Sequence, residues 1–222
     1  MRTGSVIFGE RRFALEAVVF VSAGVGMVLE LAGSRLMAPY FGNSLFVWTS
    51  LIGVILAFMS LGNYMGGRLA DRWLDPTMLS WVLGIGALGV VLTSFSEAGF
   101  LPALAEAGSV RTMSVVAACV LFAVPAVLLG VVTPYSIRLR MHGMEHAGAT
   151  VGRLYALATI GSIAGTFAAG FWLLSVMGTH NIILLCVAIL ALLAALLMGR
   201  LDWRKIALLA LVAVLAAVSW TG

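Results

Sequence analysis

Apolar residues along this chain occur in long runs, and polar residues gather in short segments between the runs. A run of about 20 apolar residues is long enough to cross the hydrocarbon core of a bilayer as an α-helix. The pattern predicts six spanning helices and a weaker seventh, at residues 13–37, 46–68, 78–96, 112–136, 151–176, 181–199 and 206–220. We therefore predict an all-α integral membrane protein, a polytopic bundle that fills residues 1–222 as a single membrane domain.

The composition excludes an ordinary soluble protein. The chain is 62% hydrophobic and 10% charged, whereas soluble domains are about 45–50% apolar and about 25% charged. Because the apolar runs cover the whole length, a soluble enzyme with a single anchor is excluded as well. Cys119 and Cys186 both lie inside apolar runs, so neither a disulfide framework nor a cysteine metal site is indicated. We expect no metal and no cofactor.

Positive charge predicts the orientation of the bundle. Eleven of the 13 Lys and Arg residues fall in the N-terminal segment and in alternate loops, and the other loops hold only Arg35 and Arg111. By the positive-inside rule the N-terminus lies in the cytoplasm, and we expect a bacterial or archaeal cytoplasmic membrane. The seventh segment is either a marginal helix that ends outside or a sign that the sequence is one piece of a longer protein. Segment 97–111 then lies outside, either as a short surface helix or, as we favour, as a plain connecting loop.

Glu30 is the main candidate for an intramembrane site. An ionisable side chain at this depth is costly unless it is paired or hydrated, so we expect Glu30 to bind a cation or exchange a proton; the alternative is a buried structural hydrogen bond. Arg35 is expected to extend to the membrane surface. Glu16 follows Arg12 by four residues near the inner interface, which favours an ordinary pair at the helix end. Glu16 and Glu30 share nearly the same helix face, so a path along that face is conceivable.

The fifth predicted span has a polar face and a glycine face. Gly161 and Gly165 form a small-xxx-small pair, which suits close helix packing. The hydroxyl groups suit either hydrogen bonds between helices or a polar cavity, and in the second case they would help to bind a substrate. This hydroxyl stripe consists of Tyr155, Thr159, Ser162 and Thr166. In the fourth span, Pro125 and Pro134 predict an interrupted backbone hydrogen-bond ladder.

A glycine-rich run ends in Gly67-Arg68-Leu69-Ala70-Asp71-Arg72 between the second and third spans. Asp71 with its neighbouring arginines can form charge-assisted bonds to another helix end, so Asp71 and Arg72 are candidates for a conformational latch. The alternative is a solvated loop that only sets the topology. The run resembles the cytoplasmic loop signature of major facilitator transporters, although Trp73, Leu74 and Asp75 replace the basic residues that usually follow.

Several motifs occur in an order that resembles one family, the membrane domain of fused major-facilitator-like/spermidine synthase proteins. The resemblance implies six helices arranged as half of a transporter, in two three-helix repeats of opposite orientation. Pro39-Tyr40 and Pro134-Tyr135, which close the first and fourth spans, are a faint trace of such a repeat. Ala158 stands where an asparagine is expected, and the synthase half is absent. The segments that carry the resemblance are residues 30–42, 47–53, 67–72, 125–134 and 152–166.

Three functions remain open from the sequence. The first is a transporter-like unit that binds or moves a polyamine or another small cation, with a homodimer enclosing the path. The second, implied by the resemblance, is an anchor or docking domain for an aminopropyltransferase whose catalytic part is a further domain or a partner chain. The third, an enzyme acting within the membrane, has no catalytic constellation to support it. Residues 84–89 fit a dinucleotide-binding pattern by letter, but they lie inside a predicted span, which favours helix packing.

Overall fold

The computed structural model describes residues 3–95, 99–141, 147–197, 209–215 and 217, with side chains from residue 13 onward. Within this part of the chain, six helical segments are long and apolar enough to span a membrane, which confirms the predicted all-α membrane bundle. The spanning elements are α1 (Thr3–Phe41), α2 (Leu45–Arg72), α3 (Pro76–Ser94), α5 (Val110–Arg140), α6 (Ala147–Ala168) with its extensions η1 (Ala169–Leu173) and α7 (Leu174–Val176), and α8 (Thr179–Leu196). Helix α5 continues through both of its prolines.

The segment between α3 and α5 differs from the plain loop that we favoured. It contains a short helix, α4 (Phe100–Ala107), which contacts both α1 and α5. The apolar face of α4 accounts for the difference, because Leu101 is completely buried while Glu106 on the same helix is exposed. The short-helix alternative is therefore the correct one.

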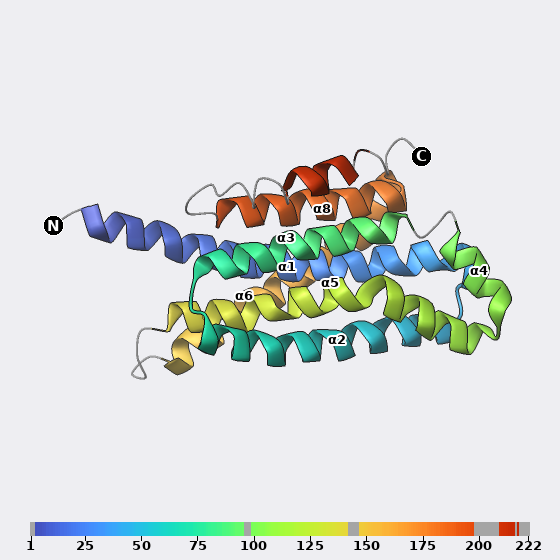
Figure 1. Cartoon of the computed structure of the whole chain (residues 1–222), viewed down its shortest axis with the longest axis horizontal. Helices are drawn as coiled ribbons and strands as arrows, with labels where there is room; N and C mark the ends of the chain where they lie inside the picture. Colours follow the sequence, from blue (N-terminus) through green and yellow to red (C-terminus); the bar gives the residue numbers. More distant parts are fainter. Residues whose placement is uncertain (1–2, 96–98, 142–146, 198–208, 216, 218–222) are drawn as a thin grey trace.

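The predicted seventh span, residues 206–220, lies only partly within the described residues. Residues 209–215 are helical and lie against α8, where Val212 is buried (Figure 1). Residues 206–208, 216 and 218–220 lie outside the described part, so the seventh span stays a prediction.

Two close helix pairs organise the bundle: α2 packs along α5, and α1 packs along α6. Glycines allow both contacts, because they bring one helix against the backbone of the other. A methyl group at Gly62 would lie 3.0 Å from the Cα of Gly130 on α5. One at Gly161 would lie 3.0 Å from the Cα of Phe20 on α1, and Gly165 meets Gly24 in the same way. The predicted packing role of Gly161 and Gly165 is thus confirmed.

The helix contacts repeat with an internal two-fold pattern. If α1, α2 and α3 are exchanged with α5, α6 and α8, the α2·α5 contact becomes α6·α1, α3·α5 becomes α8·α1, and α1·α2 becomes α5·α6. The contacts α3·α8 and α1·α5 map onto themselves. Consecutive spanning helices run in opposite directions (Figure 1), so the second set of three is inverted relative to the first.

The sequence carries a trace of this repeat, but not in the Pro-Tyr pairs that we singled out. Those pairs are 95 residues apart, whereas the residues of α1 and α5 that meet equivalent glycines, Phe20 with Val127 and Gly24 with Val131, are 107 apart. Three glycines of α2 recur in α6 at one constant interval, and the last two in each helix pack against a neighbouring backbone in the same register. Ser60 and Asn63 of α2 likewise correspond to Thr159 and Ser162 of α6. The glycine pairs are Gly53 and Gly152, Gly62 and Gly161, and Gly66 and Gly165.

Candidate functional site

Arginines gather at one end of the bundle, which we call the arginine-rich end. It comprises the C-terminal ends of α2 and α5, the start of α6 and the part of α1 around Glu16. All three ion pairs that the described residues form lie at this end, and each joins two different helices. The residues that define it are Glu16, Asp71, Arg138, Arg140 and Arg153.

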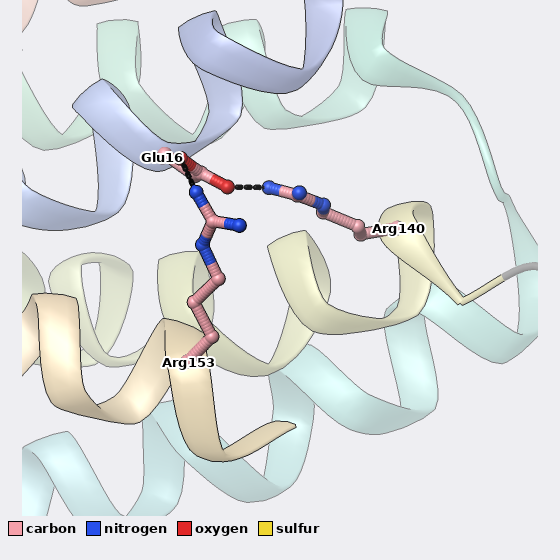
Figure 2. Close-up of polar contacts among 3 residues, drawn as sticks. All are labelled: Glu16, Arg140 and Arg153. Atoms are coloured by element: carbon pink, nitrogen blue, oxygen red, sulfur yellow. Dashed lines mark hydrogen bonds and ion pairs between the residues drawn. The ribbon is translucent and has the colours of Figure 1, made fainter. Parts of the chain in front are cut away.

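Glu16 lies between two arginines from other helices (Figure 2). Its carboxylate accepts a hydrogen bond from the Arg140 guanidinium on α5 and another, at 3.0 Å, from Nη2 of Arg153 on α6. Only 14% of the Glu16 side chain and 15% of the Arg140 side chain are exposed, against 62% for Arg153. The pair between Glu16 and Arg140 is therefore the more strongly desolvated of the two.

The sequence did not predict these partners. We expected Glu16 to pair with Arg12 at the helix end; the structure pairs it with two other helices, and the Arg12 side chain lies outside the described part. The partners that the structure describes are 124 and 137 residues away in the chain. Local spacing carries no signal for contacts of that kind, although the inverted repeat brings α1, α5 and α6 together at this end.

Asp71 forms a second link between helices. Its Oδ1 atom accepts a hydrogen bond from Nε of Arg138 on α5 at 3.1 Å. Both side chains are largely exposed, and exposed ion pairs contribute only about 0–1 kcal/mol. Arg72, the other latch candidate, instead lies over the ring of Trp73, with 5.7 Å from its Cζ atom to the ring centroid. The structure thus brings Asp71, rather than Arg72, to a neighbouring helix.

Tyr135 fixes the loop between α2 and α3 to α5. Its side chain is completely buried, and its hydroxyl lies within hydrogen-bonding distance of the carbonyl oxygens of Trp73 and Asp75, the second at 2.9 Å. The hydroxyl also accepts a hydrogen bond from the backbone N–H of Asp75 at 3.2 Å. The Asp75 carboxylate caps α3 by accepting from the N–H of Thr77. Two residues of α5 therefore hold this region: Arg138 bonds to the end of α2, and Tyr135 bonds to the loop that follows it.

The variant Asp71→Asn is expected to loosen this end of the bundle. Loss of the exposed pair with Arg138 should raise the rate of limited proteolysis in the α2–α3 loop by up to about fivefold, which corresponds to about 1 kcal/mol. The matched variant is Asp75→Asn, because asparagine retains the helix-capping oxygen and the backbone bonds to Tyr135 are untouched. Equal rates in both variants would reduce the Asp71 pair to a contact without a latching role.

Glu30 lies in the middle of the α1 span and is half-buried. Gly26 and Gly33 of α1 face Leu129 and Phe122 of α5, whereas Gly24 faces α6. Helical spacing places Glu30 between these two sides of α1. Within the part of the chain that the structure describes, its carboxylate has no hydrogen bond or ion pair. The structural alternative from the sequence, a buried hydrogen bond, is not present among these residues.

On α6, the hydroxyl stripe lies roughly a quarter of a turn around the helix from the glycine face that packs against α1. Thr159 donates to the carbonyl of Tyr155 at 3.0 Å, and Thr166 donates to the carbonyl of Ser162 at 2.8 Å, so both bonds stay within α6. Tyr155 and Thr159 are exposed, and Ser162 and Thr166 are half-buried. Among the described residues the stripe makes no hydrogen bond to another helix and none to Glu30. The threonine oxygens retain lone pairs that can accept from a bound group.

The described residues hold no group of three or more His, Cys, Asp or Glu side chains arranged to bind a metal ion. Comparison with protein-family models, with curated proteins and with solved structures finds no match for this chain.

Proposed function

We propose that this chain is a transporter-like membrane unit that binds a small organic cation at Glu30. The observation that carries the proposal is a half-buried carboxylate in the middle of a spanning helix with no partner among the described residues. A carboxylate in this position is costly to keep unless a cation or water reaches it. A polyamine is the cation that the resemblance to the spermidine synthase-related membrane domains suggests, because its ammonium groups pair with carboxylates and hydroxyl oxygens.

The arrangement of the helices supports this proposal. Inverted repeats are common in secondary transporters, whose substrate sites lie near the middle of the membrane where the repeats meet. In this chain α1 comes from the first repeat, and the helices on either side of Glu30, α5 and α6, come from the second. We further propose that the arginine-rich end faces the cytoplasm, as the distribution of positive charge predicts.

A homodimer would cover polar residues that α2 and α6 expose. Ser60 and Asn63 are exposed on α2, and the repeat-related Thr159 is exposed on α6. Lipid tails cannot satisfy the amide of Asn63, whereas a second protein surface or a water-filled cavity can. The polar positions on α2 and α6 are equivalent in the repeat. This suits a two-fold dimer in which both helices meet the other copy.

The variant Glu30→Gln tests the cation site, because glutamine keeps the size of the side chain and removes its charge. In reconstituted vesicles, spermidine binding or flux should fall by about tenfold to a hundredfold. This range follows from the about 1.5–3 kcal/mol that a hydrogen bond to a charged group contributes. The matched control is Glu106→Gln, since Glu106 is an exposed carboxylate on α4.

Two outcomes would contradict the transporter proposal. If spermidine binding is present and unchanged in Glu30→Gln, the carboxylate has a structural role. If the native protein neither binds nor moves spermidine but supports the activity of an appended aminopropyltransferase domain, the anchor function replaces transport.

A further inference from the structure

Four of the spanning helices form two bodies, the α2·α5 pair and the α1·α6 pair. Inside each pair, glycines bring the two backbones into contact. Each pair also has its own ion pair at the arginine-rich end, Asp71 with Arg138 in the first and Glu16 with Arg153 in the second. Both the backbone contact and the charges therefore hold each pair together as a unit.

The contact between the two pairs is of a different kind. Along the middle of the bundle α1 meets α5 through side chains, with an apolar crevice lined by Gly26, Met59, Pro125 and Leu129 among others. A methyl group added at Gly26 would meet only the end of the Leu129 side chain, at 3.9 Å. Near Gly26 the contact leaves room for the small sliding motions of packed helices, whereas at Gly33, towards the other end of α1, an added methyl group would lie 2.5 Å from the Phe122 ring, so the contact is tight there. Among the three ion pairs of the described residues, Glu16 with Arg140 is the one that joins the two pairs.

Glu16 also stands at the end of the helix face that leads to Glu30. Ala23 and Met27 lie between the two carboxylates on this face, and both are half-buried. Next to Glu16 the face is closed, because Val19 is completely buried against Ile137 of α5 and Leu154 of α6. The face is thus partly open at Glu30 and shut at the arginine-rich end.

We propose that the Glu16–Arg140 ion pair is a gate at the arginine-rich end of the path along α1. Opening separates the α1·α6 pair from the α2·α5 pair at this end, breaks the bond between Glu16 and Arg140, and keeps the bond between Glu16 and Arg153 within its own pair. The face carrying Ala23 and Met27 then becomes accessible down to Glu30. This inference deepens the proposed cation path, but the gate is a property of the chain without ligand and is measured without one.

Thiol accessibility tests the gate. Met27→Cys in a Cys119→Ser, Cys186→Ala background provides a single thiol on this face. An impermeant maleimide is applied from each side of the membrane. Arg140→Gln should raise the labelling rate of this thiol from the arginine-rich side by at least about tenfold, which corresponds to a loss of about 1.4 kcal/mol in the preference for the closed form.

Two matched variants separate the gate from ordinary loss of charge. Arg153→Gln removes the other partner of Glu16 and leaves the link between the pairs, so labelling should stay near the native rate. Arg140→Lys retains a positive charge at the gate and should also stay near native. If Arg153→Gln opens the face as much as Arg140→Gln does, or if Arg140→Gln has no effect, the gate is refuted.

A second thiol distinguishes opening from unfolding. Val90 on α3 is completely buried, away from the proposed path, so a thiol from Val90→Cys is labelled only when the bundle itself opens. Arg140→Gln should leave its labelling unchanged, and an equal rise at positions 27 and 90 would overturn the proposal. Spermidine binding is measured separately through Glu30→Gln, so labelling that follows the predicted pattern supports the gate even where no polyamine binds.

Discussion

Gly161→Ala is expected to lower the melting temperature of the protein in detergent, whereas Gly152→Ala, on the same helix, should leave it unchanged or raise it slightly. The added methyl group at Gly161 would lie 3.0 Å from the Cα of Phe20 and nearer still to its carbonyl, so the backbones of α1 and α6 must move apart. Overpacking of this kind costs about 1–3 kcal/mol and sometimes more, and backbone atoms cannot yield as a side chain can.

Gly152 is the matched control because nothing lies within 4 Å of the position that its methyl group would take. In an exposed helical site, alanine is favoured over glycine by roughly 0.5–1 kcal/mol, so the two substitutions should differ in sign. The repeat supplies an independent pair of variants, Gly62→Ala and Gly53→Ala on α2, which should behave in the same way. Equal melting temperatures for the variants at 152 and 161 would show that α1 and α6 do not touch through this glycine.

Tyr135→Phe is the second substitution for which a large effect is expected. It removes a buried hydroxyl that bonds to backbone groups of Trp73 and Asp75, and it leaves the ring in place. Leaving such groups without a partner costs about 1–3 kcal/mol. We expect a lower melting temperature, by roughly 2–4 °C per kcal/mol, together with faster proteolysis in the α2–α3 loop.

The control for this prediction is Tyr155→Phe, because Tyr155 is exposed on α6. Its removal of a hydroxyl should change the melting temperature little. If Tyr135→Phe is as stable as the native protein and its loop is cut at the native rate, the hydroxyl does not hold the loop.

The positions of the spanning helices could be predicted because length and apolarity alone define them. The predicted second span at 46–68, for example, corresponds to α2 at Leu45–Arg72. Helix α4 was only the less favoured alternative for its segment, because eight residues that include Pro102 fit a connecting loop as well as a short helix. The ion pairs of Glu16 could not be predicted, since they depend on how α1, α5 and α6 cross.

The same limit of sequence-based prediction applies to individual site residues: their contacts with distant parts of the chain could not be predicted. The sequence identifies Glu30 as unusual because a carboxylate interrupts an apolar run, and the structure adds that it lies between the sides of α1 that face α5 and α6. The sequence also singles out Asp71 but says nothing of Arg138. Tyr135 was noticed only as half of a Pro-Tyr pair, because a hydroxyl that bonds to a distant loop leaves no local pattern. The repeated glycine spacing was present in the sequence and could have been found by comparing α2 with α6.

The way in which the two repeats interlock bears on how the protein is made. Each close pair joins a helix of the first repeat to a helix of the second. During synthesis, α2 therefore has no packing partner until α5 is made, and α1 has none until α6 is made. Chains grow from the N-terminus at about 5–20 residues per second, so α1 and α2 are synthesised before their partners α6 and α5. During that interval the glycine faces of α1 and α2 are available to any other helix in the membrane. Assembly of the two close pairs is therefore a late event, completed only after α6 is inserted.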